Sequence, residues 1–126
     1  WIAEDYLRDH PGGVIVGGKE VVYPDGSGFV AAEVDTMSIG QCGSNQFCTW
    51  SSANYNGSFT YVTGSGVTRT MGWATKSVWN NRTNSARLYN SAGKSSTCYA
   101  PGAKQASIGS GYQTPAKVFL SSGASC

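Results

Sequence analysis

Acidic residues are missing from most of this chain of 126 residues. All seven Asp and Glu residues fall between Glu4 and Asp35, and the single histidine is His10. Paired carboxylates, or a nucleophile held beside a histidine base, are therefore absent from the rest of the sequence. No Gly-x-Ser-x-Gly element and no phosphate-binding loop is present either. The sequence argues against an enzyme and offers no catalytic residue.

Other absences restrict the partners. No run of 18 apolar residues exists, so no membrane span is expected. The net charge is only +2 and the nine Lys and Arg residues are scattered, which does not favour a nucleic acid. The four cysteines contain no Cys-x-x-Cys pair and lie far from His10, which disfavours zinc. We expect no metal and no cofactor.

The cysteines indicate an oxidising compartment. Four cysteines in a small chain with little charge are typical of a secreted protein with two disulfides. Of the three possible pairings, Cys42–Cys48 is the local one, and it leaves Cys98–Cys126 to tie down the end of the chain. The sequence begins at Trp1 without an initiator Met, as in a mature form from which a secretion signal has been removed, or a trimmed chain.

The composition, with 17 glycines, favours one domain made of short strands and tight turns. Ile2, Tyr6 and Leu7 share one face of a short helix that Pro11 would end. Extended segments bounded by turn residues predict strands at 14–16, 20–23, 28–34, 47–50, 58–63, 67–73, 76–81, 86–89, 96–99 and 116–120.

The segment 42–57 organises the main fold. Trp50 and Tyr55 can stack across a fold-back, and Gly57 can take a positive φ, which predicts a hairpin bent over its own aromatic corner. Residues 86–89 and 116–120 echo 47–50 and 76–80 at a spacing of about 40 residues. Two copies of a four-strand unit would give two sheets packed on a shared core.

Several motifs between residue 42 and about residue 120 resemble those of a known family. They are Cys42-x5-Cys48-Thr49-Trp50, Tyr55-x-Gly57, Ser77-Val78-x-Asn80, Leu88-Tyr89 and Ala100-Pro101-Gly102. In these motifs the chain resembles the secreted actinobacterial family typified by the Streptomyces metalloproteinase inhibitor. The resemblance implies a mainly β protein: a βγ-crystallin-like Greek-key sandwich of two units over residues 41–126. A short helix and a small β-meander would precede it in residues 1–40.

The resemblance also implies a function. It points to a secreted, non-enzymatic binding protein, a peptidase inhibitor or a divergent relative, with a secreted peptidase as partner. In the family's inhibitor a disulfide-closed loop in the second half presents the scissile bond. The matching region here, residues 95–101, holds one cysteine. We predict that Thr97, Cys98 and Tyr99 form the contact surface of a monomer.

Two further expectations concern other ligands. An alternative function is a cell-wall or carbohydrate-binding module of the antimicrobial type, which would use the basic main fold and exposed aromatic residues. Trp73 and Tyr112 are the aromatic residues that we expect to be most exposed. Many βγ-crystallins bind calcium through acidic or Asn residues, but no carboxylate stands shortly before Ser77 or Val118. A carboxylate calcium site is therefore not expected, and the Asn-rich loops leave only a weak site open.

Overall fold

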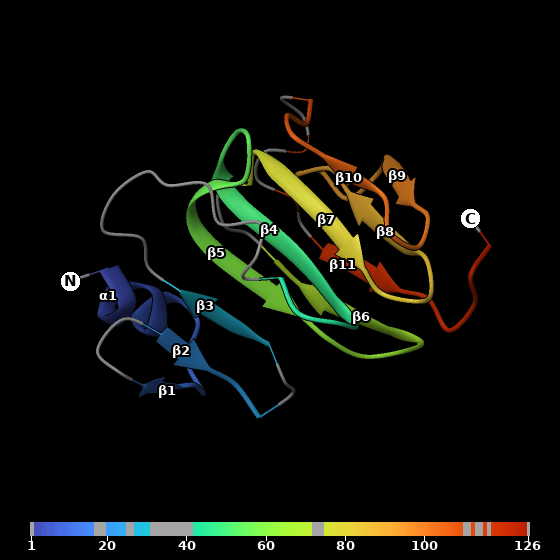
Figure 1. Cartoon of the computed structure of the whole chain (residues 1–126). Helices are drawn as coiled ribbons and strands as arrows, with labels where there is room; N and C mark the ends of the chain where they lie inside the picture. The colour runs from blue at the N-terminus through green and yellow to red at the C-terminus, as the bar shows by residue number, and fades with distance from the viewer. Residues whose placement is uncertain are drawn as a thin grey trace.

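The computed structural model describes residues 2–16, 20–24, 27–30, 42–71, 75–109, 112, 115 and 117–125. Within these residues the chain is mainly β, with one short helix and two antiparallel sheets (Figure 1), which confirms the predicted fold class at that level. The elements are α1 (Ile2–Asp9), β1 (Val14–Val16), β2 (Glu20–Val22), β3 (Gly28–Val30), β4 (Gln46–Ser52), β5 (Asn56–Val62), β6 (Val67–Thr70), β7 (Ser77–Asn81), β8 (Ala86–Tyr89), β9 (Ser96–Tyr99), β10 (Lys104–Gln105) and β11 (Lys117–Leu120).

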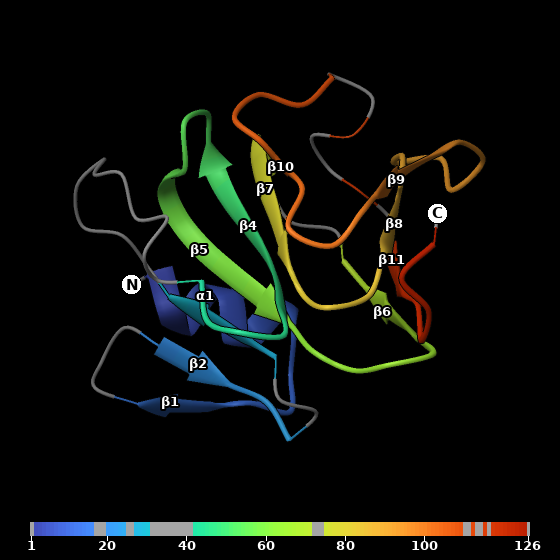
Figure 2. The ribbon, with the colours of Figure 1, turned by 45° about the vertical axis from the view of Figure 1, so that its right-hand side comes forward.

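The two sheets form two layers (Figure 2). The larger sheet has seven strands in the order β1-β2-β3-β5-β4-β7-β10, and the smaller has four in the order β6-β11-β8-β9. Strands far apart in the sequence complete each sheet, because β6 pairs with β11 and β10 pairs with β7. The smaller sheet therefore includes β6, which precedes β7, and the larger sheet includes β10, which follows β9.

The core between the sheets is built from alternate residues of the facing strands. Phe47, Val62 and Val78 come from the larger sheet, and all are at most 3% exposed. Leu88 and Val118 meet them from the smaller sheet and are fully buried. Burying each of these side chains contributes roughly 1.5–3 kcal/mol, so this layer is a principal source of stability.

The hairpin between β4 and β5 folds over its aromatic corner as predicted. Trp50 is fully buried, and its ring centroid lies 5.2 Å from that of Tyr55 in an edge-to-face contact. Gly57 follows with a φ of +88°. The hydroxyl of Ser77, from the neighbouring β7, donates to the carbonyl oxygen of Ser52 at 2.7 Å and accepts from the amide of Tyr55 at 3.0 Å. One serine therefore pins the folded hairpin onto the sheet.

A disulfide closes the loop before β4. Cys42 is bonded to Cys48, which confirms the predicted local pairing. Cys48 alternates with the core residue Phe47, so it lies on the outer face of the larger sheet, where it packs in a cluster with Trp50. Cys98 is disulfide-bonded too, and its predicted partner, Cys126, lies outside the described residues.

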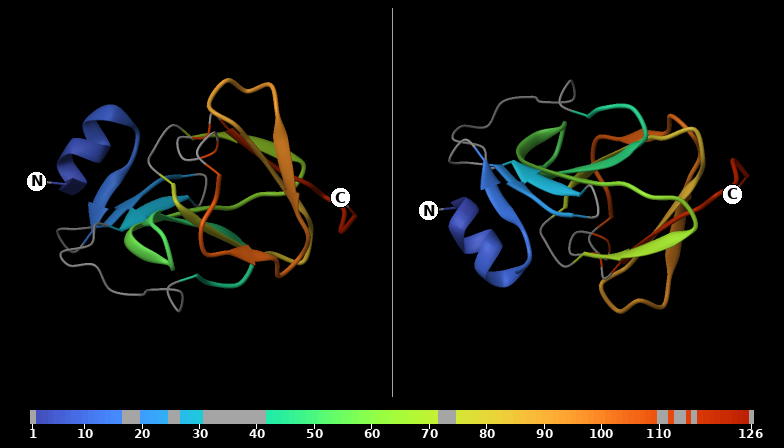
Figure 3. Two further views of the ribbon diagram at one scale, coloured as in Figure 1. Left: turned by 90° about the horizontal axis from the view of Figure 1, so that it is seen from above. Right: turned by 90° about the horizontal axis from the view of Figure 1, so that it is seen from below.

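The N-terminal helix and meander continue the larger sheet. The predicted helix forms as α1, and β3 pairs with β5, which places Phe29 opposite Thr60. Tyr6 of α1 stacks on Phe29 with ring centroids 4.0 Å apart. Since Thr60 is two residues from the core residue Val62, α1 and the smaller sheet cover the same face of the larger one. Figure 3 places α1 and the C-terminal residues at opposite ends of the molecule.

Candidate functional site

The three predicted contact residues lie in β9, where the sequence predicts a strand over residues 96–99. This strand is at the edge of the smaller sheet and pairs with β8, Leu88 standing opposite Thr97. Thr97 is exposed, Cys98 is half-buried and Tyr99 is buried at 7% exposure. The three residues are consecutive in one strand, but only the side chain of Thr97 is well exposed to solvent.

Tyr99 anchors the end of β9 in the core. Its ring centroid lies 6.0 Å from that of Phe47, and its hydroxyl donates to Oε1 of Gln105 at 2.9 Å. Burial, with a smaller contribution from Tyr112, raises the pKa of Tyr99 to about 12. The phenol is therefore held neutral, and its contacts fix the C-terminal end of β9.

A buried asparagine holds the same end of β9. The side-chain amide of Asn80 donates to the carbonyl oxygens of Tyr99 at 2.9 Å and of Ala100 at 3.2 Å. It also donates to the carbonyl oxygen of Asn84 at 3.0 Å. Asn80 is fully buried, so these bonds tie β9 to β7 across the interior.

The hairpin that joins β8 to β9 is the most prominent exposed feature next to these residues. We call residues 90–95 the β8–β9 hairpin loop. Asn90 closes it: its amide donates to the carbonyl of Ser95 at 2.9 Å, and its Oδ1 accepts from the amides of Lys94 at 3.0 Å and Ser95 at 3.3 Å. Gly93, with a φ of +71°, completes the turn. Ser91, Ala92, Lys94 and Ser95 are exposed at its tip.

Side chains brace the base of this loop. A guanidinium nitrogen of Arg87 in β8 donates to Oγ of Ser96 in β9 at 3.0 Å. The disulfide at Cys98 adds a covalent tie two residues further along β9. The sequence predicts the turn at 90–93, but nothing in it distinguishes this turn from the others as a contact site.

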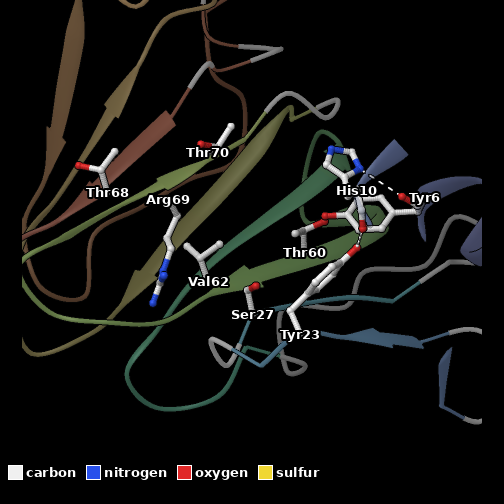
Figure 4. A pocket seen from close by; sticks show the side chains of 9 residues that line it. All are labelled: Tyr6, His10, Tyr23, Ser27, Thr60, Val62, Thr68, Arg69 and Thr70. Carbon is white, nitrogen blue, oxygen red and sulfur yellow. Dashed lines mark hydrogen bonds between the residues drawn. The ribbon is translucent and has the colours of Figure 1, made fainter. Parts of the chain in front are cut away.

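A pocket of about 330 Å³ lies between α1 and the smaller sheet (Figure 4). Its described lining is aromatic on one side and rich in hydroxyl groups on the other: Tyr6, His10, Tyr23, Ser27, Thr60, Val62, Thr68, Arg69 and Thr70. Both faces of the Tyr6 ring are covered, by His10 at 4.3 Å and by Phe29 at 4.0 Å between centroids. Tyr6 therefore presents no ring face on which a ligand could stack.

The histidine of this pocket is engaged with the backbone. Nδ1 of His10 lies 3.2 Å from the carbonyl oxygen of Tyr6, and its own carbonyl accepts from the hydroxyl of Tyr23. No carboxylate is among the described residues that line the pocket. This arrangement caps the end of α1 and holds the meander. It does not align a base with a nucleophile.

Within the part of the chain that the structure describes, no group of three or more His, Cys, Asp or Glu residues is close enough to hold a metal ion. No helix in the same residues has the length and apolar content needed to cross a membrane. Trp73 falls outside the described residues, and Tyr112 is half-buried against the core between the sheets.

Fold and site together define a small, disulfide-braced β protein that presents a rigid exposed hairpin. Residues 35–100 match peptidase inhibitor family I36, and these are 66 of the 126 residues. The chain belongs to this family, which confirms the resemblance found in the sequence. The matched region contains β4 to β9 and therefore the β8–β9 hairpin loop. Comparison with curated proteins and with solved structures gave no match.

Proposed function

We propose that the chain is a secreted, non-enzymatic peptidase inhibitor that contacts its target through the β8–β9 hairpin loop and the adjoining edge strand β9. The observation that carries the proposal is the family match, which spans this loop and ends one residue after β9. Thr97 would contact the peptidase directly. Cys98 and Tyr99 would hold the strand in place through the disulfide and the core.

The physical basis of the proposal is preorganisation. An inhibitor segment must resist cleavage and lose little conformational entropy when it docks. The β8–β9 hairpin loop is closed by the backbone and side chain of Asn90, and its base is braced by Arg87 and Ser96. The loop therefore has little freedom left to lose, and a cut within it would leave both ends held in the sheet.

The open edge of β9 supplies the second contact. Among the described residues no strand pairs with the side of β9 that faces away from β8. An extended peptide can add to such an edge by main-chain hydrogen bonds, and side chains then set specificity. Peptidase clefts bind substrates in extended form, so β9 would lie along the cleft as the extended segment, with the turn of the β8–β9 hairpin loop at one end of it.

The finer features of the fold belong to the same proposal. We infer that residues 41–126 form two Greek-key units of the βγ-crystallin kind and that residues 1–40 are an extension. Support comes from the strand order: β4 lies between β5 and β7, β8 lies between β9 and β11, and the two units exchange β6 and β10. Secretion is supported by the two disulfide-bonded positions that the structure describes, Cys42–Cys48 and Cys98.

The test is a panel of peptidases that differ in mechanism. The purified chain is titrated against thermolysin, subtilisin and papain, and inhibition of at least one is expected at a concentration on the order of 1 μM. Ala92→Glu, at the exposed tip, should weaken that inhibition by about tenfold or more. The matched control is Ser107→Glu, which adds the same charge at an exposed position outside the loop. Failure to inhibit any of the three, or equal loss in both variants, would refute the proposal.

A further inference from the structure

The outward-facing side of the four-stranded sheet is a second candidate surface. Val118 and Leu120 of β11 and Leu88 of β8 point into the core and are fully buried. Since side chains alternate along a strand, the residues between them point to solvent. We call this surface the outer sheet face. Its described members are Thr68, Thr70, Arg87, Tyr89, Ser96, Lys117, Phe119 and the half-buried, disulfide-bonded Cys98.

The strand register arranges these residues in two rows. In the first, Phe119 of β11 lies between Thr68 of β6 and Arg87 of β8, and Cys98 of β9 stands opposite Arg87. In the second, Lys117 lies opposite Thr70, and its Nζ sits 4.8 Å from the centroid of the Tyr89 ring. Neighbouring strands are roughly 4.8 Å apart, so each row spans about 15 Å over four strands.

Each row combines an aromatic ring with a cation and a hydroxyl group. Phe119 is 36% exposed and stands opposite Arg87 of the neighbouring strand. Lys117 covers the ring of Tyr89, and Ser96, opposite Tyr89, accepts from Arg87 at 3.0 Å. That bond fixes the direction of the guanidinium. The outer sheet face is therefore an ordered set of groups rather than a patch of mobile lysines.

Charge selects the class of ligand. All seven basic residues after Lys19 lie between Arg69 and Lys117, and no acidic residue follows Asp35. The field over the outer sheet face is positive, and no neighbouring carboxylate in the main fold competes for Arg87 or Lys117. An anionic partner is attracted to such a face, and a neutral one gains nothing from it.

We propose that the outer sheet face binds an anionic polysaccharide. The apolar faces of sugar rings would pack on Phe119 and beside Tyr89, where burial of apolar surface is favourable. Carboxylate or sulfate groups would meet Arg87 and Lys117. The hydroxyl groups of Thr68 and Thr70, both exposed, would bond to sugar hydroxyls. This surface shares Arg87 and Ser96 with the base of the β8–β9 hairpin loop but not the exposed tip, and sugar binding on it does not require peptidase inhibition.

Other partners fit the face less well. Nucleic-acid affinity grows with the number of phosphates neutralised, and this face offers two cations. A membrane surface would require a larger apolar patch than one exposed phenylalanine. A second copy could dock its acidic N-terminal helix here, and that outcome is included in the test.

The test is affinity electrophoresis of the whole chain in gels that contain one polymer each. The probes are polygalacturonate for carboxylate groups, heparin for sulfate groups, dextran as a neutral polysaccharide and single-stranded DNA as another polyanion. We expect retardation by polygalacturonate or heparin, none by dextran, and the weakest effect of the polyanions from DNA. Binding should fall strongly between about 0.02 M and about 1 M salt, where the Debye length drops to about 3 Å.

Variants separate the face from the overall charge. Arg87→Gln with Lys117→Gln should weaken binding by about tenfold, and Phe119→Ser by about threefold. The matched control is Lys76→Gln with Lys104→Gln, which removes two exposed charges elsewhere and should change binding by less than about twofold. Thermal melts of each variant establish that it is folded.

Several results would overturn the proposal. Equal retardation by dextran would mean that the cations play no part, and tighter binding to DNA would assign the face to nucleic acid. Equal losses of binding in the two double variants would mean that only the net charge matters. Unchanged binding by Phe119→Ser would show that sugar rings do not pack on Phe119. A dimer in sedimentation velocity at low salt that Arg87→Gln with Lys117→Gln abolishes would make a second copy the occupant.

Discussion

Replacing Gly57 by alanine tests whether the folded hairpin depends on a residue without a side chain. Gly57 has a φ of +88°, a conformation that residues with a Cβ rarely adopt. A Cβ there would collide with Oγ of Ser51 and would lie 3.0 Å from Oγ and 3.2 Å from the amide nitrogen of Ser52. Ser51 cannot move without cost, because its Oγ accepts from the amide of Ser58 at 2.8 Å.

The size of the effect follows from these two causes. The left-handed conformation costs an alanine roughly 1–2 kcal/mol. Overpacking against Ser51 and Ser52 adds roughly 1–3 kcal/mol. Gly57→Ala should therefore lower the free energy of unfolding by about 2–5 kcal/mol, and for a chain of this length it should lower Tm by about 10 °C or more.

A second glycine provides the control. Gly102 has a φ of +81°, and a Cβ there would meet nothing within 4 Å. Gly102→Ala therefore carries the conformational cost alone, about 1–2 kcal/mol. Both variants are unfolded in urea and followed by tryptophan fluorescence, to which the buried Trp50 contributes. If Gly57→Ala is no less stable than Gly102→Ala, the steric part of the reasoning is wrong.

Three further predictions concern buried polar groups. Ser77→Ala removes the hydroxyl that bridges two strands and should cost about 2–3 kcal/mol in urea titrations, and a loss below about 0.5 kcal/mol would show that the bridge is dispensable. The buried Arg82 donates to the carbonyl oxygens of Ser85, Ser121, Gly64 and Asn84. Lysine cannot reproduce the planar fork of donors, so Arg82→Lys should lower the free energy of unfolding by about 2–4 kcal/mol. Wild-type stability of this variant would contradict the prediction. Because Tyr99 has its pKa raised to about 12, the unfolded chain ionises first, near pH 10, and stability should fall as the pH rises between these values. Tyr99→Phe should remove this part of the fall in urea midpoints, and an unchanged slope would count against it.

Local pattern explains how much of the fold can be predicted. The alternation in Lys117-Val118-Phe119-Leu120 and the turn residues around each strand place the strands to within a few residues. The aromatic corner at Trp50, Tyr55 and Gly57 also follows from residue types alone. These features depend on neighbours in sequence, which is why they can be read from it.

Pairing between distant strands explains what could not be predicted. β10 consists of Lys104 and Gln105, too short to show any alternation, and it exists because β7 offers an edge. The packing of Tyr99 depends on Phe47, more than fifty positions earlier. The outer sheet face likewise requires the register that sets Phe119 beside Arg87. Each of these contacts is long-range, and no local pattern encodes it.

The edges of the two sheets show how the N-terminal residues and the proposed site are related. Without β3, the seven-residue strand β5 would be a long open edge, of the kind that pairs with other chains. Because the meander pairs with β5, the edge strand on that side of the sheet is β1, which has three residues. The edge strand on the other side is β10, which has two residues. The larger sheet therefore ends in short strands on both sides. The smaller sheet keeps a four-residue strand at each edge, β6 and β9, and β9 is held by Asn80, Tyr99 and the Cys98 disulfide. An edge that is both open and rigid is the one suited to accept a partner in extended form, and it lies within the region that defines the family.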